Sequence, residues 1–229
     1  MIRFAPILLA IIVAVIMFKV SAWRSGKNLD ARSTPLKDPA LLALTKRMAA
    51  QLDLPRLKVH IYEIDPINGL AAADGRIFIT RGFMNKYRDG IVDAEELASV
   101  IAHELGHVAL GHSKRRMLDF AGANAARVIL MTVVGRLIPF IGVYIVNALI
   151  SMLTATLSRK DEYEADAYAS ALLTKSGIGV GPQIAMFQKL DYLAGKVEGG
   201  GQLAWLMSHP KTEDRIAAIR ALDAKWHNT

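Results

Sequence analysis

The stretch His103-Glu104-Leu105-Gly106-His107 constrains the fold of this chain more than any other feature of its sequence. Its two histidines are four residues apart, and in a helix this spacing places both imidazoles on one face, one turn apart. Asp93 and Glu96 form a capping-box pattern, which predicts a helix that begins there and runs to about Leu110. Two imidazoles arranged in this way can share a tetrahedral Zn²⁺ ion.

Glu104 directly follows the first histidine, so its carboxylate can reach a water on the metal rather than the metal itself. Zinc lowers the pKa of such a water towards neutrality, and the carboxylate can take its proton and later pass it to a leaving amine. Two helix histidines can also merely pack or face solvent. Here they are two of only six histidines in the chain, and small residues (Ala102, Gly106 and Ala109) leave room for a metal or another helix. We therefore predict one Zn²⁺ per chain.

A catalytic zinc needs a third protein ligand and one open coordination position. The acidic segment Asp161–Asp166 offers candidates, since Glu162 and Asp166 are four residues apart and share a helical face. Glu162 is predicted to bind the metal, and Asp166 to accept the free N–H of a ligand histidine. Glu164 points elsewhere on the same helix. An acidic segment alone is more often an ordinary helix start, but the upstream histidines favour the metal site.

The order of these motifs resembles the M48 family of zinc metalloendopeptidases, the gluzincin group that includes HtpX-type heat-shock proteases and the CAAX prenyl protease. The motifs that carry the resemblance are His103–His107, then Ser158-Arg159, Glu162-Tyr163 and Ala165-Asp166, and finally Ser208-His209-Pro210 and Arg215-Ile216. The similarity covers roughly residues 38–222. It implies that Glu162 is the third zinc ligand.

The resemblance also implies roles for an early strand and a late histidine. Asn68, Gly69, Leu70 and Ala71 correspond to a strand that lines the cleft and pairs with an extended substrate. Gly69 and Leu70 depart from the family's Asn-Ala-Phe-Ala-like pattern, which leaves the side-chain preference of the cleft open. His209 corresponds to a residue that stabilises the oxyanion or orients the substrate.

The activity implied is zinc-dependent hydrolysis of peptide bonds, with Glu104 and His209 as catalytic residues. The expected substrates are unfolded or membrane-associated polypeptides, in protein quality control at a membrane. The alternative is a non-proteolytic membrane chaperone or scaffold that retains the peptidase fold. The complete catalytic set argues against this alternative.

The rest of the pattern predicts an α+β fold, a mainly helical zincin-like metalloprotease domain with a small early β-sheet. Asp38-Pro39 is an N-cap followed by proline, which predicts a helix that ends near Pro55. Residues 57–64 alternate as a strand, and residues 68–73 and 76–80 form a hairpin around Asp74-Gly75. Further helices are predicted at about 113–134, 137–157, 158–175, 182–194 and 212–225.

The N-terminal stretch Phe4–Phe18 carries no charge and is 15 residues long. A signal-peptide core has about 7–15 apolar residues and a membrane span about 20, so the stretch fits either. Val20-Ser21-Ala22 is typical of a cleavage site, and export after cleavage is one reading. Snorkelling of Lys19 and an interfacial Trp23 favour the other, a membrane anchor. We expect residues 1–23 to be this anchor or signal, residues 24–37 a linker, and residues 38–229 the peptidase domain.

A second uncharged stretch, Leu137–Leu157, is 21 residues long and can span a bilayer. The histidine pair precedes it and Glu162 follows it, so the chain between them must cross a membrane an even number of times. A first crossing at about 120–134 would be short and would carry Asn124 and Arg127. We therefore favour a helical hairpin over about 120–157 that turns near Gly135-Arg136 and Pro139. It would pack on the catalytic core or lie in the membrane interface. Two membrane crossings and a buried core helix are the remaining alternatives.

Composition excludes several other classes of protein. The chain has no cysteine, so disulfide frameworks, thiolate nucleophiles and cysteine-ligated zinc fingers are ruled out. Its net charge is +7, but the basic residues are scattered apart from Lys114-Arg115-Arg116, and no nucleic-acid-binding motif accompanies them. We expect no nucleic-acid partner. Attraction to anionic lipid headgroups accounts for the same charge.

Overall fold

The computed structural model describes residues 16, 20, 23–24, 26–72, 74–138, 140–195 and 212–227. In chain order the elements are β1 (Ser33–Pro35), α2 (Pro39–Ala50), β2 (Val59–Tyr62), β3 (Gly69–Ala71), β4 (Ile77–Thr80), α3 (Arg81–Arg88), α4 (Ala94–Ala109), α5 (His112–Leu137), α6 (Gly142–Lys175), α7 (Gly181–Gly195) and α9 (Thr212–His227). This mostly helical chain with one small early sheet confirms the predicted α+β class. The predicted N-terminal apolar stretch lies, except for Ile16, outside the described residues.

The four strands form one sheet in the order β1-β2-β4-β3. β2 and β4 are parallel, and β3 and β4 are the antiparallel hairpin predicted around Asp74-Gly75. Gly75 has a φ of +85°, a conformation that glycine adopts without steric cost. β4 is buried along its whole length, whereas β3 is an edge strand within the described sheet.

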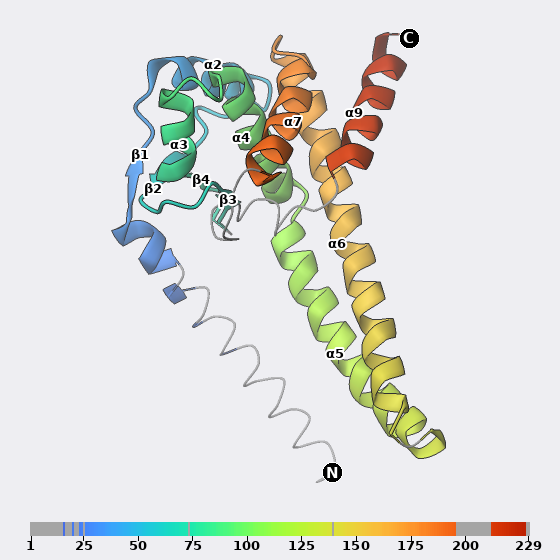
Figure 1. Cartoon of the computed structure of the whole chain (residues 1–229). Coiled ribbons are helices and arrows are strands. Elements are labelled where there is room, and N and C mark those ends of the chain that lie inside the picture. The colour runs from blue at the N-terminus through green and yellow to red at the C-terminus, as the bar shows by residue number, and fades with distance from the viewer. Residues whose placement is uncertain are drawn as a thin grey trace.

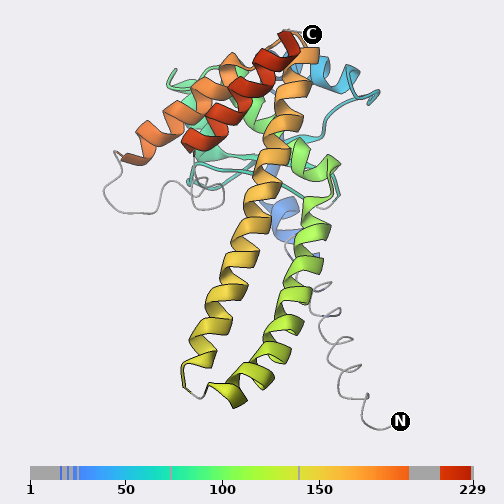
Figure 2. The same ribbon diagram turned by 90° about the vertical axis from the view of Figure 1, so that its right-hand side faces the viewer.

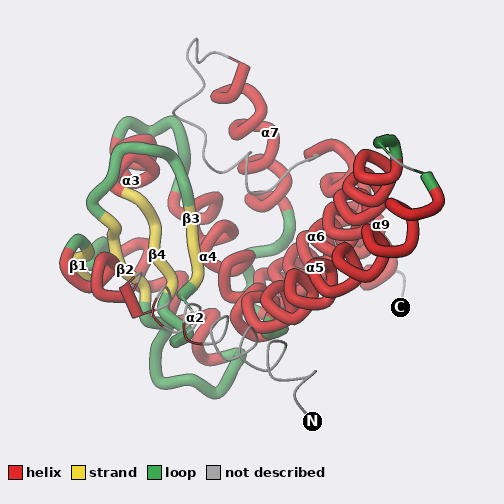
Figure 3. The backbone as a smooth tube through the Cα atoms, turned by 90° about the horizontal axis from the view of Figure 1, so that it is seen from below, coloured by secondary structure: helices red, strands yellow, loops and turns green. Residues whose placement is uncertain are grey.

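α4 is the central helix of the compact part. It packs against α2, α6, α7 and the strands β3 and β4, and it lies between the sheet and α6 (Figure 3). Both predicted N-caps are present: Asp38 accepts a hydrogen bond from the Leu41 amide at 3.0 Å, and Asp93 and Glu96 form the reciprocal capping box. Every residue from Glu96 to His107 is buried, so α4 is fixed from all sides.

Two short elements were not expected from the sequence. β1 lies inside residues 24–37, the predicted linker, and pairs antiparallel with β2. Its three residues, Ser-Thr-Pro, carry no alternating apolar pattern, so only the backbone of the neighbouring strand defines it. α3 directly follows β4 and begins at Thr80, whose hydroxyl accepts a hydrogen bond from the Phe83 amide.

α5 and α6 form the predicted helical hairpin, and its position excludes two of the four placements considered for it. The two helices run side by side and extend away from the compact part, which contains the sheet (Figures 1 and 2). Large apolar side chains along them are exposed, and among the described residues of the hairpin only Ala123, Val146 and Ile150 form a small buried cluster. The hairpin is therefore neither a buried core helix nor packed on the catalytic core. Both helices are long and apolar enough to cross a membrane.

The boundary predicted between residues 157 and 158 is also wrong. α6 is one continuous helix from Gly142 to Lys175, because no proline or glycine interrupts the chain around Ser158. The chain reverses between Leu137 and Gly142, where a side-chain atom on Gly142 would meet the Val134 carbonyl oxygen at 3.0 Å. α6 thus runs without a break from the tip of the hairpin into the compact part.

Candidate metal centre

Three of the predicted site residues lie on α4, and the third predicted metal ligand comes from α6. His103, Glu104 and His107 are all buried within α4, and Glu162 is buried on α6. The two helices approach closely at Gly106, where an added side-chain atom would lie 3.0 Å from both the Cα and the carbonyl oxygen of Ala165. The small residue noted in the sequence therefore brings α6 against the histidine face of α4.

This approach gathers the three predicted metal ligands. The Nε2 atoms of His103 and His107 are 3.1 Å apart. Glu162 places Oε2 at 3.5 Å from Nε2 of His103 and Oε1 at 3.5 Å from Nε2 of His107. One donor atom from each side chain lies within 4.8 Å of the others, as a shared metal ion requires. Two imidazole nitrogens and a carboxylate oxygen are a ligand set that suits zinc.

The distal nitrogen of His103 is fixed by the residue predicted for it. Nδ1 of His103 lies 2.9 Å from Oδ1 of Asp166. Burial opposes a charge on His103, but the hydrogen bonds to Asp166 and Glu162 prevail and raise its pKa to about 9 in the metal-free site. With Nδ1 donating to Asp166, Nε2 is the nitrogen directed towards the metal position.

Arg215 on α9 supports Asp166 in turn. Its Nε and Nη2 atoms donate to the two carboxylate oxygens of Asp166 at 2.6 and 2.8 Å. The guanidinium is buried, lies over the ring of Phe187 and is 3.5 Å from Oε2 of Glu162. Burial alone would raise the pKa of Asp166, but the hydrogen bonds from Arg215 and His103 keep it below its usual value. Arg215 belongs to a motif noted in the sequence, where no role was assigned to it.

Glu104 faces the cavity beside the edge strand. Burial raises the pKa of this carboxyl group to about 7. The cavity has a volume of about 210 Å³, and its lining includes Glu104, His107 and all four residues of the predicted substrate strand, Asn68, Gly69, Leu70 and Ala71. A segment far from the histidines in sequence therefore lies at the mouth of the same site.

A second polar cluster lies at the base of the hairpin and was missed in the sequence. It consists of His112, Arg115 and Arg116 on α5 and Asp161 and Glu164 on α6. Arg116 also donates from Nη2 to Oε1 of Glu162 at 2.9 Å. Glu164, which we predicted to point away from the metal, is absent from the histidine-pair ligand group and lies in this cluster instead. The only sequence signal was a third histidine within ten residues of His103.

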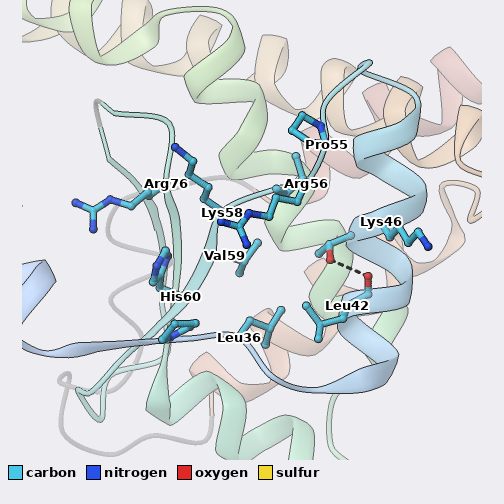
Figure 4. A pocket seen from close by; sticks show the side chains of 12 residues that line it. Leu36, Leu42, Lys46, Pro55, Arg56, Lys58, Val59, His60 and Arg76 are labelled. Carbon is cyan, nitrogen blue, oxygen red and sulfur yellow. Dashed lines mark hydrogen bonds between the residues drawn. The ribbon is translucent and has the colours of Figure 1, made fainter.

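His209, the predicted helper, lies outside the described residues. A larger cavity, of about 540 Å³, lies between α2 and the sheet, and its basic and apolar lining includes Lys46, Arg56 and Lys58 (Figure 4). Its described lining holds one histidine and no carboxylate, so this cavity does not offer the three protein ligands of a catalytic zinc centre.

Residues 35–223 match Peptidase family M48. The chain is 33% identical to the Metalloprotease LoiP of Escherichia coli (strain K12) over 160 residues, which make up 70% of this chain and 60% of LoiP. It is 28% identical to the Metalloprotease YcaL of the same organism over 196 residues, covering 86% of this chain and 73% of YcaL. It is 26% identical to a Protease HtpX homolog of Chlorobium phaeovibrioides (strain DSM 265 / 1930), covering 91% of this chain and 81% of the homolog.

Proposed function

Since the chain belongs to the M48 family of metallopeptidases, we propose that it is a zinc-dependent endopeptidase that hydrolyses peptide bonds in polypeptide substrates. The observation that carries the proposal is the convergence of His103, His107 and Glu162 beside Glu104. The same site opens onto an edge strand able to pair with a peptide. The proposed ligand set, the proposed proton acceptor and the proposed substrate strand thus lie together.

His103, His107 and Glu162 are the proposed ligands of one Zn²⁺ per chain. A bound zinc ion supplies Lewis-acid chemistry, because it polarises a carbonyl group and lowers the pKa of a water molecule. Asp166 holds Nδ1 of His103 and so directs Nε2 of the same ring towards the proposed metal position, and Arg215 keeps the Asp166 carboxylate in place. The chain itself thereby orients this donor before any metal is present.

Glu104 is the proposed general base. Its buried carboxyl group has a pKa of about 7 in the metal-free protein, close to the pH at which proton transfer in both directions is efficient. A nearby cation favours its ionised form, so that it can accept a proton from the attacking water. The same group can then return the proton to the amine nitrogen of the leaving peptide.

β3 is the proposed docking strand for the substrate. Within the described sheet it pairs on one side only, with β4, and residues 68–71 line the cavity next to Glu104. An extended peptide that adds to this edge would be bound through its backbone, largely independently of its side chains. This mode suits unfolded polypeptides of varied sequence. His209 is proposed, from the family resemblance alone, to orient the substrate or stabilise the oxyanion.

We also propose that the enzyme is membrane-associated. The α5–α6 hairpin exposes large apolar side chains at its tip, including Phe140, which is 91% exposed, and Tyr144, which is 75% exposed. An exposed apolar surface of this extent is unfavourable in water. Insertion of both helices keeps the ligands of α4 and α6 on one side of the bilayer, because two crossings return the chain to that side. An N-terminal anchor would hold the enzyme at the same membrane, where quality control of membrane-associated proteins is the proposed role.

Hydrolysis of casein by the purified full-length chain in detergent, compared with its Glu104→Gln variant, tests the proposed function. The glutamine keeps the shape of the side chain but cannot act as a base. We expect the variant to retain about one zinc per chain and to lose hydrolysis by at least about 100-fold, the lower part of the range for general acid–base catalysis. Unchanged hydrolysis would contradict the role of Glu104. A zinc-loaded wild type that cleaves nothing would favour the scaffold alternative.

A further inference from the structure

The two candidate histidine ligands have different partners at their distal nitrogens. Nδ1 of His103 faces the carboxylate of Asp166, whereas Nδ1 of His107 lies 2.7 Å from Nδ1 of a third histidine, His112. His112 is buried, with 1% of its side chain exposed, and comes from the first turn of α5. Its other nitrogen, Nε2, lies 3.3 Å from Oε2 of Glu164.

This geometry determines which ring nitrogens of His107 and His112 carry a proton. If Nε2 of His107 binds the metal, as the proposed function requires, Nδ1 of His107 carries its proton and donates. Nδ1 of His112 must then be the acceptor, since two N–H groups cannot face each other at 2.7 Å. His112 therefore carries its proton on Nε2 and donates it to the Glu164 carboxylate.

We propose that His112 is a positioning residue for zinc, which accepts the Nδ1–H of His107 and is itself oriented by Glu164. This inference rests on the proposed function, because it needs His107 as a metal ligand. Two distinct supports then hold the two ligands: a carboxylate backed by Arg215 for His103, and an imidazole backed by Glu164 for His107. The neutral imidazole support holds His107 without adding a second negative charge beside the metal.

His112, Asp161 and Glu164 also have the spacing of a second metal site. The contacts around them favour the positioning role. Arg115 donates to both carboxylates, at 2.7 Å to Glu164, and Arg116 donates from Nε to Asp161 at 3.0 Å. Two guanidinium groups therefore already balance the two carboxylates, and one nitrogen of His112 is used by His107.

The test compares His112→Phe with His112→Asn in the full-length protein. Phenylalanine keeps a ring but removes both nitrogens, whereas the side-chain oxygen of asparagine can stand near the position of Nδ1 and accept the same hydrogen bond. Zinc affinity is measured by competition with a chromogenic chelator, and it needs no hydrolysis. We expect His112→Phe to bind zinc about 10- to 100-fold more weakly, the usual effect of losing such a partner, and His112→Asn to restore most of the affinity.

A spectroscopic measurement on the wild type decides the question even if His112→Phe does not fold. In zinc-loaded protein with ¹⁵N-labelled histidine, a scalar coupling across the hydrogen bond should link Nδ1 of His107 to Nδ1 of His112. Absence of this coupling, wild-type zinc affinity in His112→Phe, or two zinc ions per chain would each overturn the proposal. Zinc binding with the coupling present but no casein hydrolysis would contradict the proposed function and leave this inference intact.

Discussion

A side-chain carbon added to Gly106 would lie 3.0 Å from the Cα atom of Ala165, which is closer than such atoms normally approach. The absence of a side chain at this position is what allows α4 and α6 to meet beside the candidate ligands. The approach of these two helices determines whether Glu162 can share a metal with the histidines. Gly106 is therefore a position where a very small change should affect the site.

Replacement of Gly106 by alanine should weaken zinc binding and lower stability. The contacts at 3.0 Å are with backbone atoms of α6, so the helix rather than a flexible side chain must move. Overpacking of this kind costs about 1–3 kcal/mol. Urea unfolding and zinc content measure the two effects. Gly122→Ala is the matched control, since nothing lies within 4 Å of a side chain there, and it should leave both unchanged or raise stability.

Glu162→Ala should remove the carboxylate ligand and with it most of the bound zinc. The loss in affinity should exceed the about 10- to 100-fold expected when only a hydrogen-bond partner of a ligand is removed. Elemental analysis after dialysis against dilute chelator measures it. Glu95→Ala, an exposed glutamate in the first turn of α4, is the control and should keep its zinc. If Glu95→Ala lost its zinc and Glu162→Ala kept it, the ligand assignment would be wrong.

Removal of Arg215 should destabilise the protein strongly. Arg215→Met leaves the buried Asp166 carboxylate without its main counter-charge, and breaking a buried pair in this way costs about 3–5 kcal/mol. The midpoint of denaturant unfolding should fall accordingly. Arg220→Met, at an exposed position of the same helix, should change it little. In the double variant with Asp166→Asn the loss should be smaller than the sum of the single losses, because the uncompensated charge is gone.

The metal-free protein should become less stable as the pH rises from about 6.5 to 9. In this form burial opposes the charge on His103, but hydrogen bonds to Asp166 and Glu162 raise its pKa to about 9, above the value of 6.5 in an unfolded chain. A raised pKa contributes stability that is complete below pH 6.5 and is lost as the pH rises through 9. Urea unfolding in the presence of a chelator measures this slope. His103→Gln should flatten it, and an unchanged slope would contradict the pKa of His103.

The starts of α2 and α4 were predictable because their signals are local. The capping box at Asp93 and Glu96 and the N-cap at Asp38 defined the starts of α4 and α2, and the structure confirms both. β1 was not predictable, since its pairing with β2 depends on the partner strand and not on its own three residues. The position of the hairpin stayed open at the level of the sequence for a similar reason. An apolar helix suits a protein core and a lipid environment equally, and its sequence does not distinguish them.

One part of the candidate site could likewise be predicted from the sequence, and another part could not. The spacing of His103 and His107, and of Glu162 and Asp166, follows from the helical repeat and can be read from the sequence. The partners of those residues cannot, because they join distant segments: Arg215 reaches Asp166 from α9, and Arg116 reaches Glu162 from α5. His112 lies close to His107 in sequence, but a left-handed turn at Gly111, with a φ of +67°, separates the two helices and redirects its ring.

The hairpin leaves the compact part just after the histidine pair and returns just before Glu162, with its base tied by Arg115 and Arg116 to Asp161. The positions of the candidate metal ligands depend on the two ends of the hairpin, where it leaves and rejoins the compact part, and not on the length of its helices. Its arms can therefore be longer or shorter in another chain of this family, provided that both change by matching numbers of helical turns. Under the proposed insertion of both helices, arms of another length would fit a membrane of another thickness without altering any of the proposed ligands.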